Sequence, residues 1–262
     1  MRRKLSTINK FLLRTATVVS LSFMAFTQAS YASSHTDYKI IGEDSRVKVN
    51  NTTLNPYQSI TFIESKFNNV YEDCSGTVIA PNKVITAAHC VYNPQYGGLT
   101  EQSKITPGLN GKIAPFGQFE SNDIKVPQQY KDHQEDQYDI AIIDVKPRNG
   151  VSIGNVVKPI QMEASDNSKN KEVEITGYPS DKFEQLRVQT QWSSSSLVDF
   201  QDGNKAYYTA DTISGESGAP VFNKQTKNII GVHTGAVETS AGLYNRGTTF
   251  TKNILKWVQQ NL

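Results

Sequence analysis

The sequence predicts an all-β protein, either a barrel or a sandwich, that ends in one helix. Short segments rich in β-branched and aromatic residues recur, each bounded by Gly, Pro, Asn or Asp, which is the pattern of strands and turns. No helical periodicity lies between these segments, so helices interleaved with strands are not expected. The expected strands are residues 59–65, 76–80, 83–88, 140–145, 172–178, 206–211, 220–224, 228–234 and 247–251.

The C-terminal residues are the part of the chain that shows helical spacing. Ile254, Leu255, Val258 and Leu262 fall on one face of a helix, which predicts a terminal helix packed on the body of the protein. The four consecutive serines at 193–196 are interpreted as a surface turn.

The first 32 residues predict an export signal. Five Lys and Arg residues lie within the first 14 positions, an apolar stretch follows at 15–27, and small residues at Ser30 and Ala32 suit cleavage after Ala32. The apolar stretch would rise only about 20 Å as a helix, short of a bilayer core of about 30 Å. We therefore expect secretion without a membrane anchor.

The charge balance excludes some partners. Six of the 27 Lys and Arg and one of the 25 Asp and Glu precede Ile40, so the rest of the chain carries 21 bases and 24 acids. A net charge near −3 gives no support for a nucleic-acid partner or for an anionic membrane surface. About 220 residues remain after the leader, which suits one large domain or two small ones.

The chain has two cysteines, Cys74 and Cys90. In an exported protein such a pair indicates a disulfide rather than a metal site, because no CxxC or HxxxH spacing accompanies it. The acidic run at 132–136 also lacks the ligand spacing of a calcium site. No metal and no cofactor are predicted.

Ser217, in "GESGAP" (215–220), is either a nucleophile or a small residue in a glycine-rich turn. A nucleophilic serine needs a base, and the chain has four histidines. His35 follows the signal cleavage site, and His133 lies in a charged run typical of a solvated loop. His89 ends an apolar strand beside Cys90, which leaves His89 and His233 as candidates for the base.

Three motifs resemble the chymotrypsin-like serine proteases. They are "CSGTVIAPNKVITAAHC" (74–90), "QYDIAIIDV" (137–145) and "GESGAP", and they occur in that family's order of histidine, acid and serine. More narrowly, "TGYPSDK" (176–182), "APVF" (219–222) and "VHTG" (232–235) are similar to bacterial glutamyl endopeptidases. The resemblance runs from about Ile40 to the C-terminus.

This resemblance implies a domain organisation. The expected fold is two six-stranded antiparallel β-barrels with a C-terminal α-helix. The expected parts are a signal peptide at 1–32, a short pro-segment at 33–39, an N-terminal barrel at 40–150, and a C-terminal barrel with the helix at 151–262. In "YKIIGEDSR" the mature chain begins either at Ile40, after Lys39, or at Val47, after Arg46.

The resemblance also implies the catalytic roles. Ser217 would attack a peptide carbonyl, His89 would accept its proton, and Asp139 would hold the imidazole. Asp144 has the opposite parity on the same strand and would point away from the site. The backbone N–H groups of Gly215 and Ser217 would bind the oxyanion, and glycine at 215 suits torsions that a Cβ would penalise.

Two interpretations of specificity remain open. The resemblance to glutamyl endopeptidases implies that Thr212 and His233 bind a substrate carboxylate. Trypsin-like enzymes place an aspartate six residues before the serine, where this chain has Asp211, and such a charge would favour Lys or Arg. Asp211 would otherwise turn away, or pair with His233 and raise its pKa. Ser214 stands where the family usually has glycine.

We therefore expect a secreted bacterial serine endopeptidase, monomeric, that acts on protein or peptide substrates after Glu or Asp. Two alternatives stay open: cleavage after Lys or Arg through Asp211, and a non-catalytic binding or toxin module with a protease-like fold.

Overall fold

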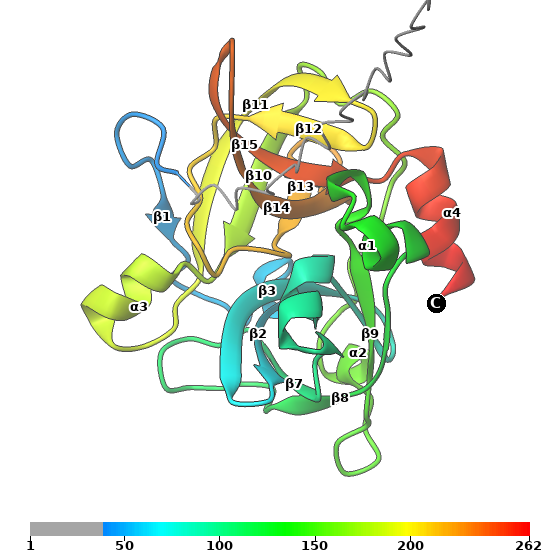
Figure 1. Cartoon of the computed structure of the whole chain (residues 1–262). Coiled ribbons are helices and arrows are strands. Elements are labelled where there is room, and N and C mark those ends of the chain that lie inside the picture. The colour runs from blue at the N-terminus through cyan, green and yellow to red at the C-terminus, as the bar shows by residue number, and fades with distance from the viewer. Residues whose placement is uncertain (1–38) are drawn as a thin grey trace, which may run out of the picture. The chain divides into compact units, whose positions relative to one another are not determined.

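Two closed antiparallel β-barrels of six strands each make up the computed structural model, which describes residues 39–262 (Figure 1). This confirms the predicted fold class. The predicted signal peptide and residues 33–38 of the predicted pro-segment lie outside the described residues. Within 39–262 no helix has the length and apolar character needed to cross a bilayer.

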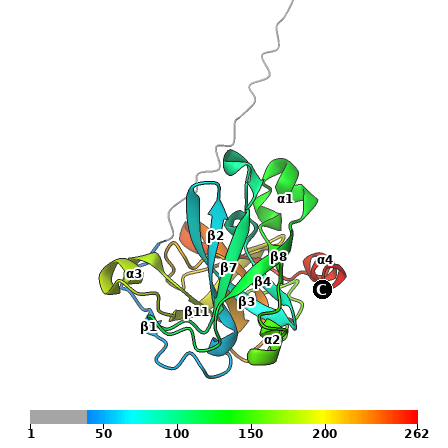
Figure 2. The ribbon, with the colours of Figure 1, turned by 90° about the horizontal axis from the view of Figure 1, so that it is seen from below.

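The first barrel has the strand order β2-β3-β4-β9-β8-β7, and Figure 2 looks onto it from below. Its interior is an apolar cluster that includes Ile63, Val84, Ile105 and Ile143, all fully buried. The strands are β2 (Ile60–Phe67), β3 (Val70–Ala80), β4 (Lys83–Thr86), β7 (Gln102–Pro107), β8 (Phe119–Lys125) and β9 (Ala141–Val145).

The second barrel follows the order β11-β10-β13-β14-β15-β12, and a further β11–β12 pairing closes it. Val173, Ile175, Val198 and Ile230 fill its interior. The strands are β10 (Glu172–Gly177), β11 (Trp192–Asp202), β12 (Lys205–Tyr208), β13 (Pro220–Asn223), β14 (Ile229–Thr239) and β15 (Gly242–Thr249).

A third apolar cluster lies between the barrels. It joins Ile85 and Ile142 of the first barrel to Val232 of the second. Ile254 and Val258 of α4 (Lys252–Gln260) belong to the same cluster, so the terminal helix, red in Figure 1, packs against the cluster as predicted. Leu262, expected on the same face, is 47% exposed, because α4 ends two residues earlier.

The first strand of the described residues packs on the second barrel. The short strand β1 (Val47–Lys48) pairs with β11, so that Val47 lies opposite Ser193. Residues 47–48, placed in the first barrel by the sequence-based boundaries, therefore extend the sheet of the second.

The serines at 193–196 form part of β11 and not the surface turn that the sequence suggested. They pair with β10, from Ser193 opposite Thr176 to Ser196 opposite Val173. The hydroxyl of Ser194 accepts a hydrogen bond from the backbone N–H of Asp211 at 2.9 Å. Serine suits this strand because its hydroxyl bonds neighbouring backbone that the ladder leaves unpaired.

Short elements complete the fold. The sequence pattern indicated no helix before the C-terminus, but a few helical turns occur within the connections, where they are too short to show a periodicity. The α-helices are α1 (Gln128–His133), α2 (Ile153–Val156) and α3 (Ser180–Leu186); the 3-10 turns are Tyr57–Ser59, Ala88–Cys90, Pro94–Tyr96 and Asp136–Tyr138; and β5 (Tyr92–Asn93) pairs with β6 (Gly98–Leu99).

Candidate active site

The structure brings Ser217, His89 and Asp139 together although they are far apart in the sequence. His89 lies in the 3-10 turn that follows β4, and Asp139 lies two residues before the first residue of the buried strand β9. Ser217 lies in the loop between β12 and β13 of the second barrel. Cys90 forms a disulfide with Cys74 of β3, which ties the turn carrying His89 to the barrel wall.

The three side chains form one hydrogen-bonded line. The Nε2 atom of His89 is 2.7 Å from Ser217 Oγ, and its Nδ1 is 2.7 Å from Asp139 Oδ2. The other oxygen of Asp139 accepts the backbone N–H of His89 at 3.1 Å. An ionised carboxylate can only accept, so Nδ1 carries the proton and Nε2 is left to accept the proton of the serine hydroxyl.

The charges and burial around this line make His89 a stronger base and keep Asp139 ionised. Burial lowers the pKa of the His89 imidazole, but the charge and hydrogen bond of Asp139 outweigh it, so the pKa lies above its ordinary value. Burial raises the pKa of Asp139, and the charge and hydrogen bonds of His89 reverse that effect and hold it low. Asp139 therefore stays ionised while His89 titrates.

Other acids near this line are engaged elsewhere. Asp144, on β9, pairs with Lys83 at 2.5 Å, as its parity on the strand predicts. Asp136 pairs with Lys205 at 3.0 Å and with Arg246 at 2.8 Å.

The turn before the nucleophile requires glycine at 215. Gly215 has φ +93°, and a Cβ at this position would collide with the carbonyl oxygen of Tyr178. Ser214, the departure from the family pattern, lies outside the left-handed region, so a side chain is accommodated there. Its carbonyl accepts the N–H of Ser180 at 2.8 Å, which fixes the peptide plane that contains the Gly215 N–H.

Ser75 of the first barrel fixes the neighbouring peptide plane. Its hydroxyl donates to the carbonyl of Gly215 at 2.8 Å and accepts the N–H of Tyr178 at 3.0 Å. Its backbone N–H donates to the carbonyl of Ser217 at 2.7 Å. Ser75 was not predicted from the sequence; its place beside Cys74 was the available signal.

The two residues expected to bind a substrate carboxylate are both fully buried. His233, on β14, exchanges backbone hydrogen bonds of 2.8 Å with the segment after the nucleophile, at Gly218 and Ala219. Its Nδ1 is 2.8 Å from the hydroxyl of Tyr208. Burial lowers the pKa of His233 to about 3, so the ring is neutral at neutral pH. The hydroxyl of Thr212 has no hydrogen-bond partner among the described residues.

Asp211 turns to the segment 41–45 and does not pair with His233. Its carboxylate accepts the backbone N–H of Ile41 at 2.7 Å, the N–H of Ser45 at 2.8 Å, and the hydroxyl of Ser45 at 2.6 Å. Of the arrangements considered from the sequence, turning away is therefore the one observed. The suggestion that Asp211 raises the pKa of His233 is wrong, because that pKa is lowered and burial is its main cause.

Comparison with known proteins assigns the chain to a family. The family model described as Trypsin matches residues 44–258. The chain belongs to the trypsin family.

Individual relatives agree with this placement. A glutamyl endopeptidase of Bacillus licheniformis is 32% identical over 223 residues, which cover 82% of this chain and 66% of that protein. A solved structure described as a Glu endopeptidase in complex with MPD has a TM-score of 0.77 and 34% identity, and the match covers 85% of this chain and 99% of that one. The predicted resemblance to glutamyl endopeptidases is confirmed, and these similarities support a serine endopeptidase.

A further relative, an extracellular metalloprotease of Bacillus subtilis by its description, is 28% identical over 234 residues that cover 84% of this chain and 68% of that protein. Within residues 39–262, the side chains close enough to share a metal ion are Cys74, His89 and Cys90. This donor set does not fit a metal site, because the two sulfurs are bonded to each other.

Proposed function

We propose that this member of the trypsin family is a secreted serine endopeptidase that cleaves peptide bonds after Glu or Asp through an acyl-enzyme. The observation that carries the proposal is the hydrogen-bonded line from Ser217 Oγ through His89 to Asp139, with both distances at 2.7 Å. Such a line activates an alcohol for attack and returns the proton to the leaving amine.

In this mechanism His89 takes the proton of Ser217 as the oxygen attacks the substrate carbonyl. Asp139 keeps the imidazole in the required tautomer and stabilises the imidazolium without taking the proton. The N–H groups of Gly215 and Ser217 stabilise the developing oxyanion, and one such donor contributes about 3 kcal/mol. Water then attacks the acyl carbonyl with His89 as the base, and the bond to Ser217 Oγ breaks as His89 returns the proton to that oxygen.

The proposed acidic specificity rests on Thr212, His233 and Asp211. When the Tyr208 hydroxyl donates to Nδ1 of neutral His233, Nε2 carries the proton and donates to a carboxylate. The Thr212 hydroxyl, buried and without a hydrogen-bond partner in the described part of the chain, supplies a second donor. The Asp211 carboxylate, which would repel an acidic side chain, is occupied by Ile41 and Ser45.

The exposure of the two candidate cleavage sites favours processing after Lys39 over processing after Arg46. Lys39 is exposed, whereas the side chain of Arg46 is 1% exposed and held by two carboxylates. We therefore propose that the mature chain begins at Ile40, after a signal peptide at 1–32 and a pro-segment at 33–39.

The test measures a set of peptides that differ only at the residue before the cleaved bond: Glu, Asp, Gln or Lys. A hydrogen bond to a charged group contributes about 1.5–3 kcal/mol, so kcat/KM for Glu should exceed that for Gln by roughly 10–100-fold. A preference for Lys would support the Asp211 alternative. A processed chain that fluorophosphonates do not label would favour the non-catalytic module.

The Thr212→Val variant sharpens the test. It should lower the Glu-to-Gln preference about tenfold. It should not destabilise the protein, because the lost hydroxyl has no hydrogen-bond partner within residues 39–262. Thr77→Val is the matched control, since Thr77 in β3 also buries a hydroxyl that has no partner among the residues described. It should leave the preference unchanged. An unchanged preference in Thr212→Val would contradict the assignment of this residue.

A further inference from the structure

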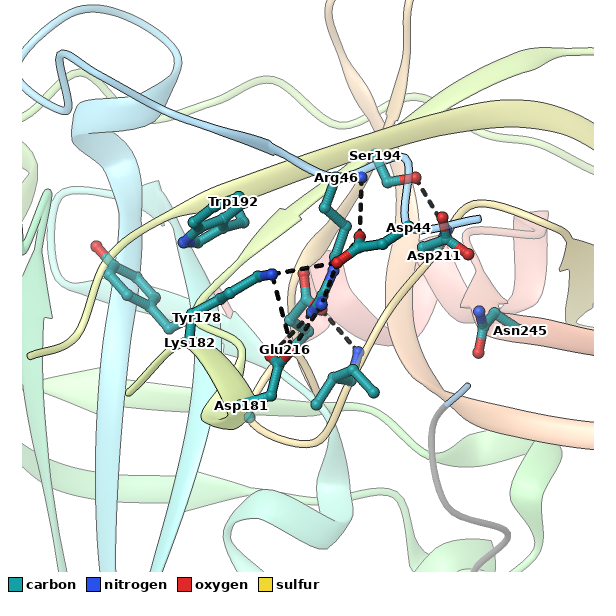
Figure 3. A network of polar contacts seen from close by, with 12 residues as sticks. Asp44, Arg46, Tyr178, Asp181, Lys182, Trp192, Ser194, Asp211, Glu216 and Asn245 are labelled. Atoms are coloured by element: carbon teal, nitrogen blue, oxygen red, sulfur yellow. Dashed lines mark hydrogen bonds and ion pairs between the residues drawn. The ribbon is translucent and has the colours of Figure 1, made fainter. Parts of the chain in front are cut away.

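A buried arginine near the start of the described chain joins three carboxyl groups (Figure 3). The guanidinium of Arg46 has five N–H donors. Nε and Nη2 bond the two oxygens of Asp44, both at 2.9 Å, and Nη1 and Nη2 bond those of Asp181 at 3.0 and 2.6 Å. Four donors are thus used, and Nη1, which holds the fifth, lies 3.9 Å from Oε2 of Glu216.

Glu216 directly precedes the nucleophile and closes the turn in front of it. Its Oε2 accepts the backbone N–H of Ile213 at 2.7 Å, and its own N–H donates to the carbonyl of Ile213 at 3.1 Å. The Glu216 side chain is 1% exposed. Two hydrogen bonds between Ile213 and Glu216 therefore close the turn 213–216. The guanidinium of Arg46 is the cation beside the Glu216 side chain that makes one of them.

We propose that Arg46, acting through Glu216, is a positioning residue that keeps the turn 213–217 in the shape that aims the backbone N–H groups of Gly215 and Ser217 at the oxyanion. The inference rests on the proposed function. It adds that residues 44–46, far from the nucleophile in sequence, help to position the turn that carries the oxyanion donors. Asp44 and Asp181 hold the guanidinium of Arg46 in place, and the guanidinium in turn holds the carboxyl group of Glu216.

The charges of the cluster support this arrangement. Arg46 and Lys182 are cations facing Asp44 and Asp181, and Lys182 is 3.1 Å from Asp44. Glu216 adds a third carboxyl group to this balanced set, and burial raises its pKa to about 8 although Arg46 lowers it. Without Arg46, the charged groups that act on Glu216 would be the two aspartates, which disfavour its ionised form.

A consequence concerns the N-terminus. A chain that began at Val47 would lack Asp44 and Arg46 and would leave Glu216 without its cation. We infer that activity needs a start at or before Asp44, so trimming after Arg46 would inactivate the enzyme.

The experiment compares processed wild type with Arg46→Met, which removes the charge but keeps the length of the side chain. The readouts are kcat and KM for a Glu-containing peptide, and the affinity for the corresponding peptide aldehyde, which forms an oxyanion on Ser217. We expect at least a tenfold fall in kcat, KM within threefold of wild type, and a loss of aldehyde affinity that matches the loss of kcat.

Lys182→Met is the matched control. Lys182 pairs with Asp44 and lies over the ring of Trp192, but no contact joins it to Glu216 within the described residues. Its kcat should stay within threefold of wild type. In the double variant Arg46→Met with Glu216→Gln, kcat should be no lower than in Arg46→Met alone, because two residues that act through one contact are not additive.

The outcomes separate this inference from the proposed function. A wild type that neither cleaves peptides nor reacts with fluorophosphonates would overturn the proposed function and this inference with it. An active wild type with an unimpaired Arg46→Met variant, folded by circular dichroism, would overturn this inference alone. Equal losses in Arg46→Met and Lys182→Met, or additive losses in the double variant, would also contradict it.

Discussion

Replacing Ser75 by alanine should lower both stability and turnover, by amounts that follow from its contacts. The change leaves the Gly215 carbonyl and the Tyr178 N–H without their partner. Each buried group left unsatisfied costs about 1–3 kcal/mol, so the free energy of unfolding should fall by about 2–6 kcal/mol. In a domain of this size, 1 kcal/mol corresponds to roughly 2–4 °C in Tm.

The effect of Ser75→Ala on kcat has a separate physical origin. The Gly215 carbonyl is part of the turn that carries the oxyanion donors, and full loss of one donor costs roughly 10²–10³ in kcat. We expect a fall of at least about tenfold, up to that limit, with little change in KM. Stopped-flow or steady-state kinetics well below the melting temperature would measure it, with thermal unfolding recorded on the same preparation.

Ser65→Ala provides the control for Ser75. Ser65 is also fully buried in the first barrel, where its hydroxyl is 2.9 Å from that of Ser103. The control should lose stability and keep kcat. If Ser75→Ala, still folded, kept kcat within twofold of wild type, the reasoning that Ser75 holds the turn would be refuted.

Three further predictions test the electrostatics and the covalent link. The kcat/KM should rise with pH with a midpoint above 6.5, because catalysis needs neutral His89 and Asp139 raises its pKa; a midpoint below 6.5 in a pH profile would contradict this. Lys205→Met should move that midpoint further upward, since the buried ammonium lowers the pKa of His89; a downward shift would refute the sign. Replacing Cys74 and Cys90 together by serine should cost about 3 kcal/mol in chemical denaturation for a loop of this length, and an unchanged denaturation midpoint would count against it.

The pH dependence of stability from His89 has a defined sign. Its folded pKa lies above the unfolded value, so the stabilisation is fully present below the unfolded pKa. It is lost as pH rises through the folded pKa. Activity and this part of the stability therefore change in opposite directions as the pH increases.

Local patterns explain why much of the site was predictable from the sequence. The strands that precede His89 and follow Asp139 and Ser217 are short apolar runs, and their order along the chain restricts the topology. Gly215 was predicted to need unusual torsions, and its φ of +93° agrees.

The contacts that sequence reasoning missed join distant segments. Ser75 reaches Gly215 across 140 positions, and Asp211 reaches Ile41 across 170. No local pattern reports such a partner, because it depends on how the barrels pack. The buried Lys205 was missed for the same reason: its ammonium is satisfied by Thr234, Thr248 and Asp136, which come from three separate elements.

The apolar layer between the barrels determines when the folding chain can gain proteolytic activity. Ile85 and Ile142 on one side and Val232 on the other have no cover until both halves are complete. Until then the imidazole and the alcohol are held on separate pieces of structure. A copy in which one barrel is unfolded would expose these isoleucines and could not attack a peptide bond, because His89 and Ser217 meet only when both barrels have folded.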